Sequence, residues 1–488
     1  MKGGLAEEAG TALFWKALLQ GGTHLIYLLR LLILARLLVP EDFGLLAIAM
    51  TGIGLSLRLT DLGMQPALVQ RPTLTDQYYN TAWTVGVLRA VVIGAGVFFT
   101  APLVATLFAE PSAVDIIRVL ALLPALDALS SIRIAELIRK LHFRSLGIAK
   151  LVEALANTII SIALAPTLGV WALVIGTLMG PLGYAIVSYI LAPHRPRFSL
   201  DRAAAQSLIR YGQWIFVTGL MTVTGGALLR LIISRQMGTA ELGIYFLAAK
   251  LAFLPNEIAS EVVGAVSFPV YARVQSNISQ ATRTFRAIFT SMFLILTPVF
   301  TLMFVLAPSI VKYVLGNQWE GAELLIRLLA LVGLVGLVGD AAVPALKGLG
   351  QPHKYALLEG GQSFFLVIFA WIFINQFGLI GAGYAWGAVI APTLLFSILF
   401  LRQSLRLPFA DITKPLIAIA LSSVTGGLVA LYLGNAFQGL VGICVAAVVA
   451  IACTGVILWV LNKVLELNLT REVAKVFPQT GPLLASLE

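Results

Sequence analysis

The chain has 488 residues, of which 59% are hydrophobic and only 11% are charged. Soluble globular chains carry about 25% charged residues, so this composition excludes a cytosolic enzyme, a nucleic-acid-binding domain and a disordered scaffold. It predicts an integral membrane protein with the lipid bilayer as its surroundings. Whether the formal net charge of +10 reflects a partner or the membrane topology depends on where the basic residues lie.

Long apolar segments recur along the whole chain. A membrane-spanning helix needs about 20 mostly apolar residues, and we predict an all-α polytopic membrane protein with about 14 transmembrane helices. The loops between them leave no room for a soluble catalytic domain, so we expect a transporter and not an enzyme. The predicted spans lie near 12–38, 43–65, 80–107, 114–135, 145–165, 169–192, 208–236, 241–268, 286–306, 320–345, 355–375, 379–401, 412–433 and 439–462.

The basic residues are distributed unevenly between the two sides of these spans. With the N-terminus placed in the cytoplasm, 22 of the 33 Lys and Arg residues fall in cytoplasmic segments and three in external segments. The positive-inside rule requires such an asymmetry. We therefore predict that both termini are cytoplasmic. Most of the positive charge then reflects topology, and no nucleic-acid partner is expected.

An internal repeat relates the two halves of the chain. Residues 28–45 read LLRLLILARLLVPEDFGL and residues 228–244 read LLRLIISRQMGTAELGI. A looser match joins GVWALVIG at 169–176 to GLIGAGYAWG at 378–387. The alternative explanation is chance similarity between apolar segments, but the first match also pairs Arg30 with Arg230, Arg36 with Arg235 and Gly44 with Gly243.

The offset of the repeat is about 200 residues, or six spans. Because six is even, the two copies have the same orientation, as in a parallel repeat about an axis along the membrane normal. We expect three parts: an N-terminal six-helix lobe at 1–200, a second six-helix lobe at 201–405, and two extra helices with a cytoplasmic tail at 406–488.

Several basic residues fall deep inside predicted spans, where a charge costs roughly 2.5–3.5 kcal/mol at the helix centre. No acidic neighbour lies at helical spacing from Arg30, Arg89, Arg230 or Lys250, as expected if they line a cationic central cavity. The alternative role is to hold helices together. The planar guanidinium of arginine can donate two hydrogen bonds at once to a phosphate or a carboxylate group. The candidate substrate-binding residues are Arg30, Arg58, Arg89, Arg230 and Lys250.

Intramembrane acids are the candidates for ion coupling, and these are Asp61, Glu153 and Glu257. The pairs Arg58–Asp61 and Lys150–Glu153 also have ion-pair spacing, so their role could be structural. The sequence has no phosphate-binding loop and no metal-ligand spacing, so we assign no catalytic residue, metal or cofactor. A proton or sodium gradient, or downstream use of the substrate, is then left as the energy source.

Two segments resemble a known family. The segment LARLLVPEDFGLLAIAM at 34–50 is followed by DLGMQPALVQR at 61–71. Together they resemble the polysaccharide-transport family of the multidrug/oligosaccharidyl-lipid/polysaccharide (MOP) exporter superfamily. Within it, the likeness is to the colanic-acid and teichuronic-acid exporter group of Wzx-type flippases.

The resemblance implies a function. A member of this group flips undecaprenyl-diphosphate-linked oligosaccharide repeat units from the cytoplasmic to the periplasmic leaflet of the bacterial inner membrane. The units serve capsule, exopolysaccharide or O-antigen synthesis. It implies alternating access of two lobes around the central cavity. Arg30 and Arg230 would then approach one another across the outer part of that cavity. The protein partners to consider are a polysaccharide polymerase and a chain-length regulator. The alternative functions are a multidrug-type small-molecule/ion antiporter and a lipid II flippase.

Overall fold

The fold is known from a computed structural model, which describes residues 2–59, 75–140, 142–199, 201, 223–274, 277–405, 410–465 and 467. This part of the chain is helical and contains no strand. Eleven of its helices are long and apolar enough to cross a membrane. The predicted all-α polytopic fold is therefore confirmed. Asp61 and the side chain of Arg58 lie outside the described residues.

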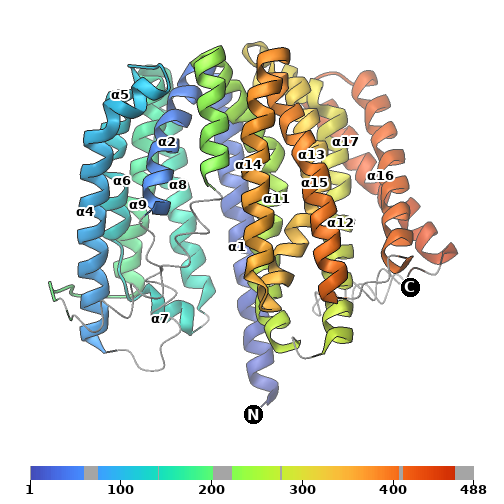
Figure 1. The fold of residues 1–488 in the computed structure, drawn as a ribbon, viewed down its shortest axis with the longest axis horizontal. Coiled ribbons are helices and arrows are strands. Elements are labelled where there is room, and N and C mark those ends of the chain that lie inside the picture. The colour runs from blue at the N-terminus through green and yellow to red at the C-terminus, as the bar shows by residue number, and fades with distance from the viewer. Residues whose placement is uncertain are drawn as a thin grey trace. The chain divides into compact units, whose positions relative to one another are not determined.

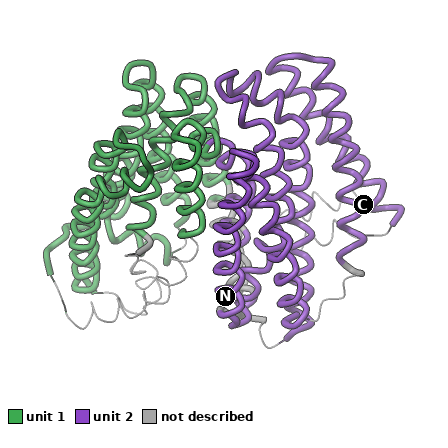
Figure 2. The backbone as a smooth tube through the Cα atoms, turned by 45° about the horizontal axis from the view of Figure 1, so that its top comes forward, with its two compact units in different colours: residues 1–246 green, residues 247–488 purple. Residues whose placement is uncertain are grey.

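The helices pack into two compact units, residues 1–246 and 247–488 (Figure 2). The predicted lobes at 1–200 and 201–405, and the separate segment at 406–488, rest on the sequence repeat and stay a prediction. The long helices of the first unit (Figure 1) are α1 (Lys2–Leu37), α2 (Pro40–Leu59), α4 (Asp76–Leu107), α8 (Phe143–Leu168) and α9 (Val170–Leu191).

The predicted fourth span, 114–135, is not one continuous helix. The chain forms α5 (Ala113–Leu120), α6 (Leu123–Ala128) and α7 (Ile134–Arg139), separated by turns. Pro124 stands in the first turn of α6, where a residue without an N–H is tolerated although it could not continue an earlier helix. Hydropathy alone does not register this break, since the turns between α5 and α6 are as apolar as the helices.

Helices α8 and α9 form a tight antiparallel pair. A Cβ added to Gly176 would lie 1.9 Å from Ser161 Oγ, and one added to Gly180 would lie 3.3 Å from Asn157 Cβ. Small residues let two helix backbones approach closely. The pair turns at Gly169, whose φ of 54° favours glycine.

The second unit contains a matching turn. Helices α14 (Pro352–Phe377) and α15 (Ile380–Leu405) are joined at Gly378, with φ 61° and ψ −143°, close to the φ 54° and ψ −128° of Gly169. These are the two glycines that begin the looser match of the repeat. Equal backbone conformation at matched positions supports a true repeat over chance similarity.

The stronger repeat match also has a structural counterpart, where α2 and α11 (Thr239–Val274) begin side by side. A Cβ on Gly44 would lie 2.0 Å from the Thr239 carbonyl oxygen, and a Cβ on Gly243 would lie 1.8 Å from that of Pro40. Pro40 and Thr239 are themselves matched positions, so the contact is reciprocal. Reciprocal contacts are what a local two-fold axis produces.

The second unit packs around a core of aromatic and aliphatic side chains from α11, α12, α13 and α15, including Tyr271, Phe285, Phe289 and Phe300. Helix α16 packs against α12 and against α17. The remaining helices of this unit are α12 (Ile278–Ser309), α13 (Ala322–Gly348), α16 (Ala410–Ala436) and α17 (Gly439–Val464).

Candidate functional site

A polar cluster occupies the first unit where α1, α8 and α9 meet. Helices α1 and α8 run parallel: Leu19 packs where a Cβ on Gly147 would stand, and eleven residues further along α1 Arg30 reaches Ser161. The Nε of Arg30 donates to Ser161 Oγ at 3.3 Å, and that hydroxyl donates to Asn157 Oδ1 at 3.3 Å. This chain of hydrogen bonds joins α1 to α8.

The guanidinium of Arg30 has donor capacity to spare. Its Nη2 is buried and has no hydrogen-bond partner among the described residues. Buried donors are normally satisfied, so each exception calls for an explanation such as a missing ligand or water. An anion at this position would accept from Nη2 and would also offset the charge.

Lys150 and Glu153 lie on α8 close to this point. The Lys150 Nζ is 2.6 Å from Glu153 Oε2 and 4.5 Å from the centroid of the Tyr184 ring on α9. The predicted ion pair is confirmed. The side chain of Lys150 is 56% exposed and that of Glu153 is 19% exposed, so the lysine is the more exposed partner of the pair.

Arg89 and Arg230 both reach towards α2. The Nη2 of Arg89 on α4 donates to the carbonyl of Leu57 at 3.2 Å. The Nη1 of Arg230 donates to Thr51 Oγ1 at 3.3 Å. The side-chain hydrogen bonds of Arg30 and Arg230 thus end on hydroxyl groups, and within the described part of the chain no carboxylate pairs with either arginine.

The structure corrects the sequence analysis at Lys250. This residue does have an acidic partner, because its Nζ lies 2.9 Å and 2.8 Å from the two carboxylate oxygens of Glu257. The two residues are seven apart, which is two turns of helix α11; the sequence analysis considered acids only one turn away. One candidate for substrate binding and one candidate for ion coupling therefore form a single ion pair.

Asp340 on α13 is an intramembrane acid that was not among the predicted ion-coupling residues. The Nδ2 of Asn256 donates to Asp340 Oδ2 at 2.8 Å and to the carbonyl of Gly333 at 3.0 Å. Ser260 also hydrogen-bonds the carboxylate. A Cβ on Gly333 would lie 2.8 Å from Asn256 Oδ1, so this glycine makes room for the amide. The signal was an acid inside the apolar span 320–345.

Three curated relatives are similar in sequence. The succinoglycan biosynthesis transport protein ExoT of Rhizobium meliloti (strain 1021) is 26% identical over 380 residues, which cover 77% of this chain and 73% of that protein. The lipopolysaccharide biosynthesis protein WzxC of Escherichia coli (strain K12) is 22% identical over 308 residues, or 62% of each chain. The teichuronic acid biosynthesis protein TuaB of Bacillus subtilis (strain 168) is 21% identical over 316 residues, or 62% of this chain and 61% of that one.

Solved structures share the fold. A lipid II flippase MurJ in an inward closed conformation superposes with a TM-score of 0.73 at 13% identity, covering 92% of this chain and 99% of that chain. An inward-facing multidrug resistance MATE family transporter of the MOP superfamily gives 0.62 at 17% identity, covering 78% of this chain and 95% of that one. At such identities the likeness concerns the fold alone.

The family described as "polysaccharide biosynthesis protein" matches residues 33–323, which is more than half of the chain. The match includes both segments, 34–50 and 61–71, that carry the predicted resemblance. One of the relatives, ExoT, is named as a transport protein, and the solved structures that share the fold are a flippase and a transporter. The chain is a multi-pass membrane protein that belongs to the polysaccharide biosynthesis protein family.

Proposed function

We propose that the protein flips undecaprenyl-diphosphate-linked oligosaccharide repeat units from the cytoplasmic to the periplasmic leaflet of the bacterial inner membrane. The lipid tail stays in the bilayer, while the diphosphate and sugars cross through the polar interior by alternating access of two lobes. The names of the relatives support a polysaccharide precursor as the cargo. The buried Nη2 of Arg30, which has no acceptor among the described residues, is the observation that carries the proposal.

Positive charge in the first unit suits a diphosphate. Within the described residues, the side-chain hydrogen bonds of Arg30 and Arg230 end on hydroxyl groups, so their charges are left for a ligand. A charge-assisted hydrogen bond contributes about 1.5–3 kcal/mol, and an arginine fork matches phosphate oxygens. We assign substrate binding to Arg30, Arg58, Arg89, Arg230 and Lys250, with Lys250 available only after it separates from Glu257.

Ion coupling is the second part of the proposal. Asp61, Glu153 and Glu257 remain the candidates from the sequence, and Asp340 joins them because its carboxylate lies within a span. A carboxylate in a low-dielectric interior is costly unless it is paired or functional. A proton or sodium gradient would act through these groups, and a polymerase and a chain-length regulator would take up the flipped unit.

Transport by purified protein in vesicles tests the function. We expect transbilayer movement of an undecaprenyl-diphosphate-linked glycan, and no movement of a cationic dye, because an antiporter for cationic drugs needs an acidic cavity. Lipid II serves as the third substrate. Movement of lipid II alone would make the protein a lipid II flippase, and movement of the dye alone would make it a multidrug-type antiporter.

The orientation is proposed with both termini in the cytoplasm, so that Glu41 faces the periplasm and Phe198 the cytoplasm. Cys444 and Cys453 are free thiols and are first replaced by alanine. An impermeant maleimide added to intact cells should then label Glu41→Cys and spare Phe198→Cys. Labelling of Phe198→Cys with protection of Glu41→Cys would reverse the orientation.

A further inference from the structure

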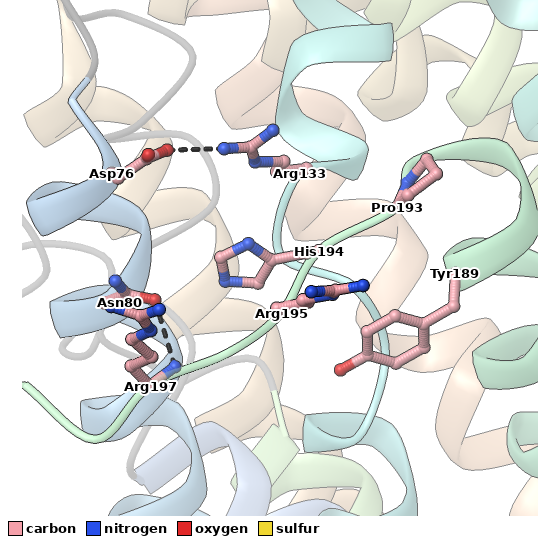
Figure 3. Close-up of a pocket in the computed structure, with 8 residues that line it drawn as sticks. All are labelled: Asp76, Asn80, Arg133, Tyr189, Pro193, His194, Arg195 and Arg197. Atoms are coloured by element: carbon pink, nitrogen blue, oxygen red, sulfur yellow. Dashed lines mark hydrogen bonds and ion pairs between the residues drawn. The ribbon is translucent and has the colours of Figure 1, made fainter.

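A basic cavity of about 640 Å³ lies on the first unit (Figure 3), and its lining includes none of the residues in the polar cluster around Arg30. Its walls come from the first turns of α4, from Arg133 just before α7, and from the segment that follows α9. Figure 3 shows the side chains of Arg133, His194 and Arg195 arranged around this space. None of these side chains was assigned a role above.

The segment after α9 is held against α4 by its backbone. The N–H of Arg197 donates to Asn80 Oδ1 at 3.1 Å, that of Ser199 to Thr84 Oγ1 at 3.1 Å, and that of Asp201 to Thr81 Oγ1 at 3.2 Å. Three such bonds fix a stretch that has no helical hydrogen bonds of its own. The backbone that carries Arg195 and Arg197 to the cavity wall is therefore held in place.

The cavity carries unneutralised positive charge. Arg133 is paired with Asp76 and lies over the Tyr79 ring, 5.5 Å from its centroid. Arg195 and Arg197 have no acidic partner among the residues that the structure describes. Burial and the charge of Arg133 lower the pKa of His194 against the opposing effect of Asp76, so this imidazole is neutral at pH 7. Two positive charges are left for a ligand.

Two buried nitrogen atoms without hydrogen-bond partners also favour a bound ligand in this cavity. The Nε of Arg133 and the Nε2 of His194 are buried and have no hydrogen-bond partner within the described residues. Arg195 and Arg197 are exposed, so they can close over an anion from the open side. A phosphate offers acceptor oxygens to all three arginines at once.

Aromatic side chains place the cavity at the level of lipid headgroups. Trp83 meets Phe198 edge to face, with ring centroids 5.1 Å apart, and Tyr79 lies near His194. Tyr189 forms a further part of the wall. Aromatic residues of this kind concentrate where a spanning helix leaves the bilayer, and basic pockets between helix ends on the cytoplasmic side bind anionic lipid headgroups.

We propose that this cavity binds the phosphate of a membrane lipid headgroup, with Arg195 and Arg197 as the anion-binding side chains and Arg133 behind them. Two lipids offer this chemistry. One is an anionic phospholipid of the bilayer, which would make the cavity a lipid site independent of transport. The other is a polyprenyl diphosphate, in which case the inference rests on the proposed function and the cavity is a first contact for the cargo.

Lipid titration of the purified full chain, followed by native mass spectrometry, tests the proposal. The probes are phosphatidylglycerol, cardiolipin, undecaprenyl diphosphate and, as the neutral lipid, phosphatidylcholine. The variant is Arg195→Gln with Arg197→Gln. Its matched control is Arg283→Gln with Arg402→Gln, two exposed arginines of the second unit on the same predicted side of the membrane.

We expect the Arg195/Arg197 variant to bind at least one phosphate lipid about tenfold more weakly, with the control and phosphatidylcholine binding unchanged. The replacements Arg195→Lys with Arg197→Lys keep the charge and should restore most of the binding, which separates a charge effect from misfolding. Loss confined to phosphatidylglycerol and cardiolipin identifies a phospholipid site. Loss confined to undecaprenyl diphosphate identifies a cargo site.

Equal affinities of the Arg195/Arg197 variant, its control and the unaltered chain for every phosphate lipid would overturn the proposal. This outcome differs from failure of the proposed function. A chain that moves no glycan lipid in vesicles but loses phosphatidylglycerol binding in the variant would keep this cavity as a lipid site while removing the flippase assignment.

Discussion

The polar interiors of the two units differ in how their charges are satisfied. In the first unit, Arg30 and Arg230 bond to the hydroxyl groups of Ser161 and Thr51. In the second unit, Lys250 is bonded to both oxygens of Glu257, and the carboxylate of Asp340 accepts from Asn256 and Ser260. Among the described residues, Arg30 and Arg230 of the first unit have no bonded carboxylate, although Lys150 in that unit pairs with Glu153. In the second unit, the carboxylate of Asp340 is bonded to neutral donors.

This difference separates two tasks. A cation inside a membrane protein is costly unless it is paired or lines a path for an anion, so the first interior is suited to the diphosphate of the cargo. A carboxylate held by neutral donors can take up a proton or a cation, so the second interior is suited to ion coupling. The two units therefore differ in the chemistry of their interiors.

Removing one basic residue from each interior should give the largest contrast. Arg30→Ala removes a charge-assisted contact of about 1.5–3 kcal/mol, so we expect roughly ten- to hundredfold slower transport of the glycan lipid. Lys250→Ala removes a partner of a half-exposed ion pair, worth at most about 1 kcal/mol, so transport should fall by less than about fivefold. Initial rates in vesicles, normalised to inserted protein, measure both effects. Equal losses of transport would contradict the proposed difference between the two interiors.

A lysine replacement separates the charge of Arg30 from the planar shape of its guanidinium. Arg30→Lys keeps the charge but loses the planar fork, so its transport defect should be milder than that of Arg30→Ala. The measurement is the same vesicle rate as for the alanine variant. A lysine variant as slow as alanine would show that the fork matters more than the charge, and one that equals the unaltered protein would leave the charge as the sole requirement.

The packing behind each interior can be tested with two glycines. A Cβ on Gly176 would lie 1.9 Å from Ser161 Oγ, the acceptor of Arg30, whereas a Cβ on Gly336 would come no closer than 3.8 Å to a neighbour. Overpacking costs about 1–3 kcal/mol, so Gly176→Ala should lower the thermal unfolding temperature of the purified protein. Gly336→Ala should leave it almost unchanged. If both substitutions lowered that temperature equally, the close α8–α9 contact would not explain the destabilisation.

The smallest expected effect concerns pH outside the two interiors. Burial would raise the pKa of Glu110, but hydrogen bonds from Ser112 and Thr239 outweigh it and lower that pKa. The native state therefore binds fewer protons there than the unfolded state, so this group's stabilisation is full above the ordinary glutamate pKa of about 4.3 and is lost as the pH falls through the lowered value. Unfolding temperatures at pH 7 and pH 4 measure it.

Glu110→Gln removes the titrating group and should lose less stability between those two pH values than the unaltered chain does. An identical pH dependence in the two proteins would contradict the assignment. The variant also serves as a background in which any pH dependence of transport is assigned to the interior acids and not to this loop.

Much of the fold could be predicted from the sequence because a bilayer imposes long apolar segments and a charge asymmetry. The repeat was visible at Gly44 and Gly243 because close helix contact there tolerates no side chain. The break at Pro124 was missed because the turns of α5–α6 are themselves apolar. A single proline at a helix start does not reveal that break without the structure.

The candidate site was predicted less completely. Lys150 and Glu153 were paired correctly since their spacing is one turn of helix. The partner of Lys250 lay two turns away, and Asp340 is satisfied by Asn256 on another helix, 84 positions away in the chain. Contacts between distant helices are not encoded in any local spacing, so residue types alone could indicate a polar interior but not how its charges are satisfied.

Export by the double variant Arg30→Ala with Arg230→Ala tests the central claim most directly. The variant is expressed in a strain that lacks its own exporter, with Arg118→Ala as a control because Arg118 is half-exposed and paired with Asp115. The account predicts normal amounts of both proteins in the membrane, with little surface polysaccharide and accumulated lipid-linked precursor only in the double variant. Normal polysaccharide export by the double variant would contradict it and would make both arginines structural.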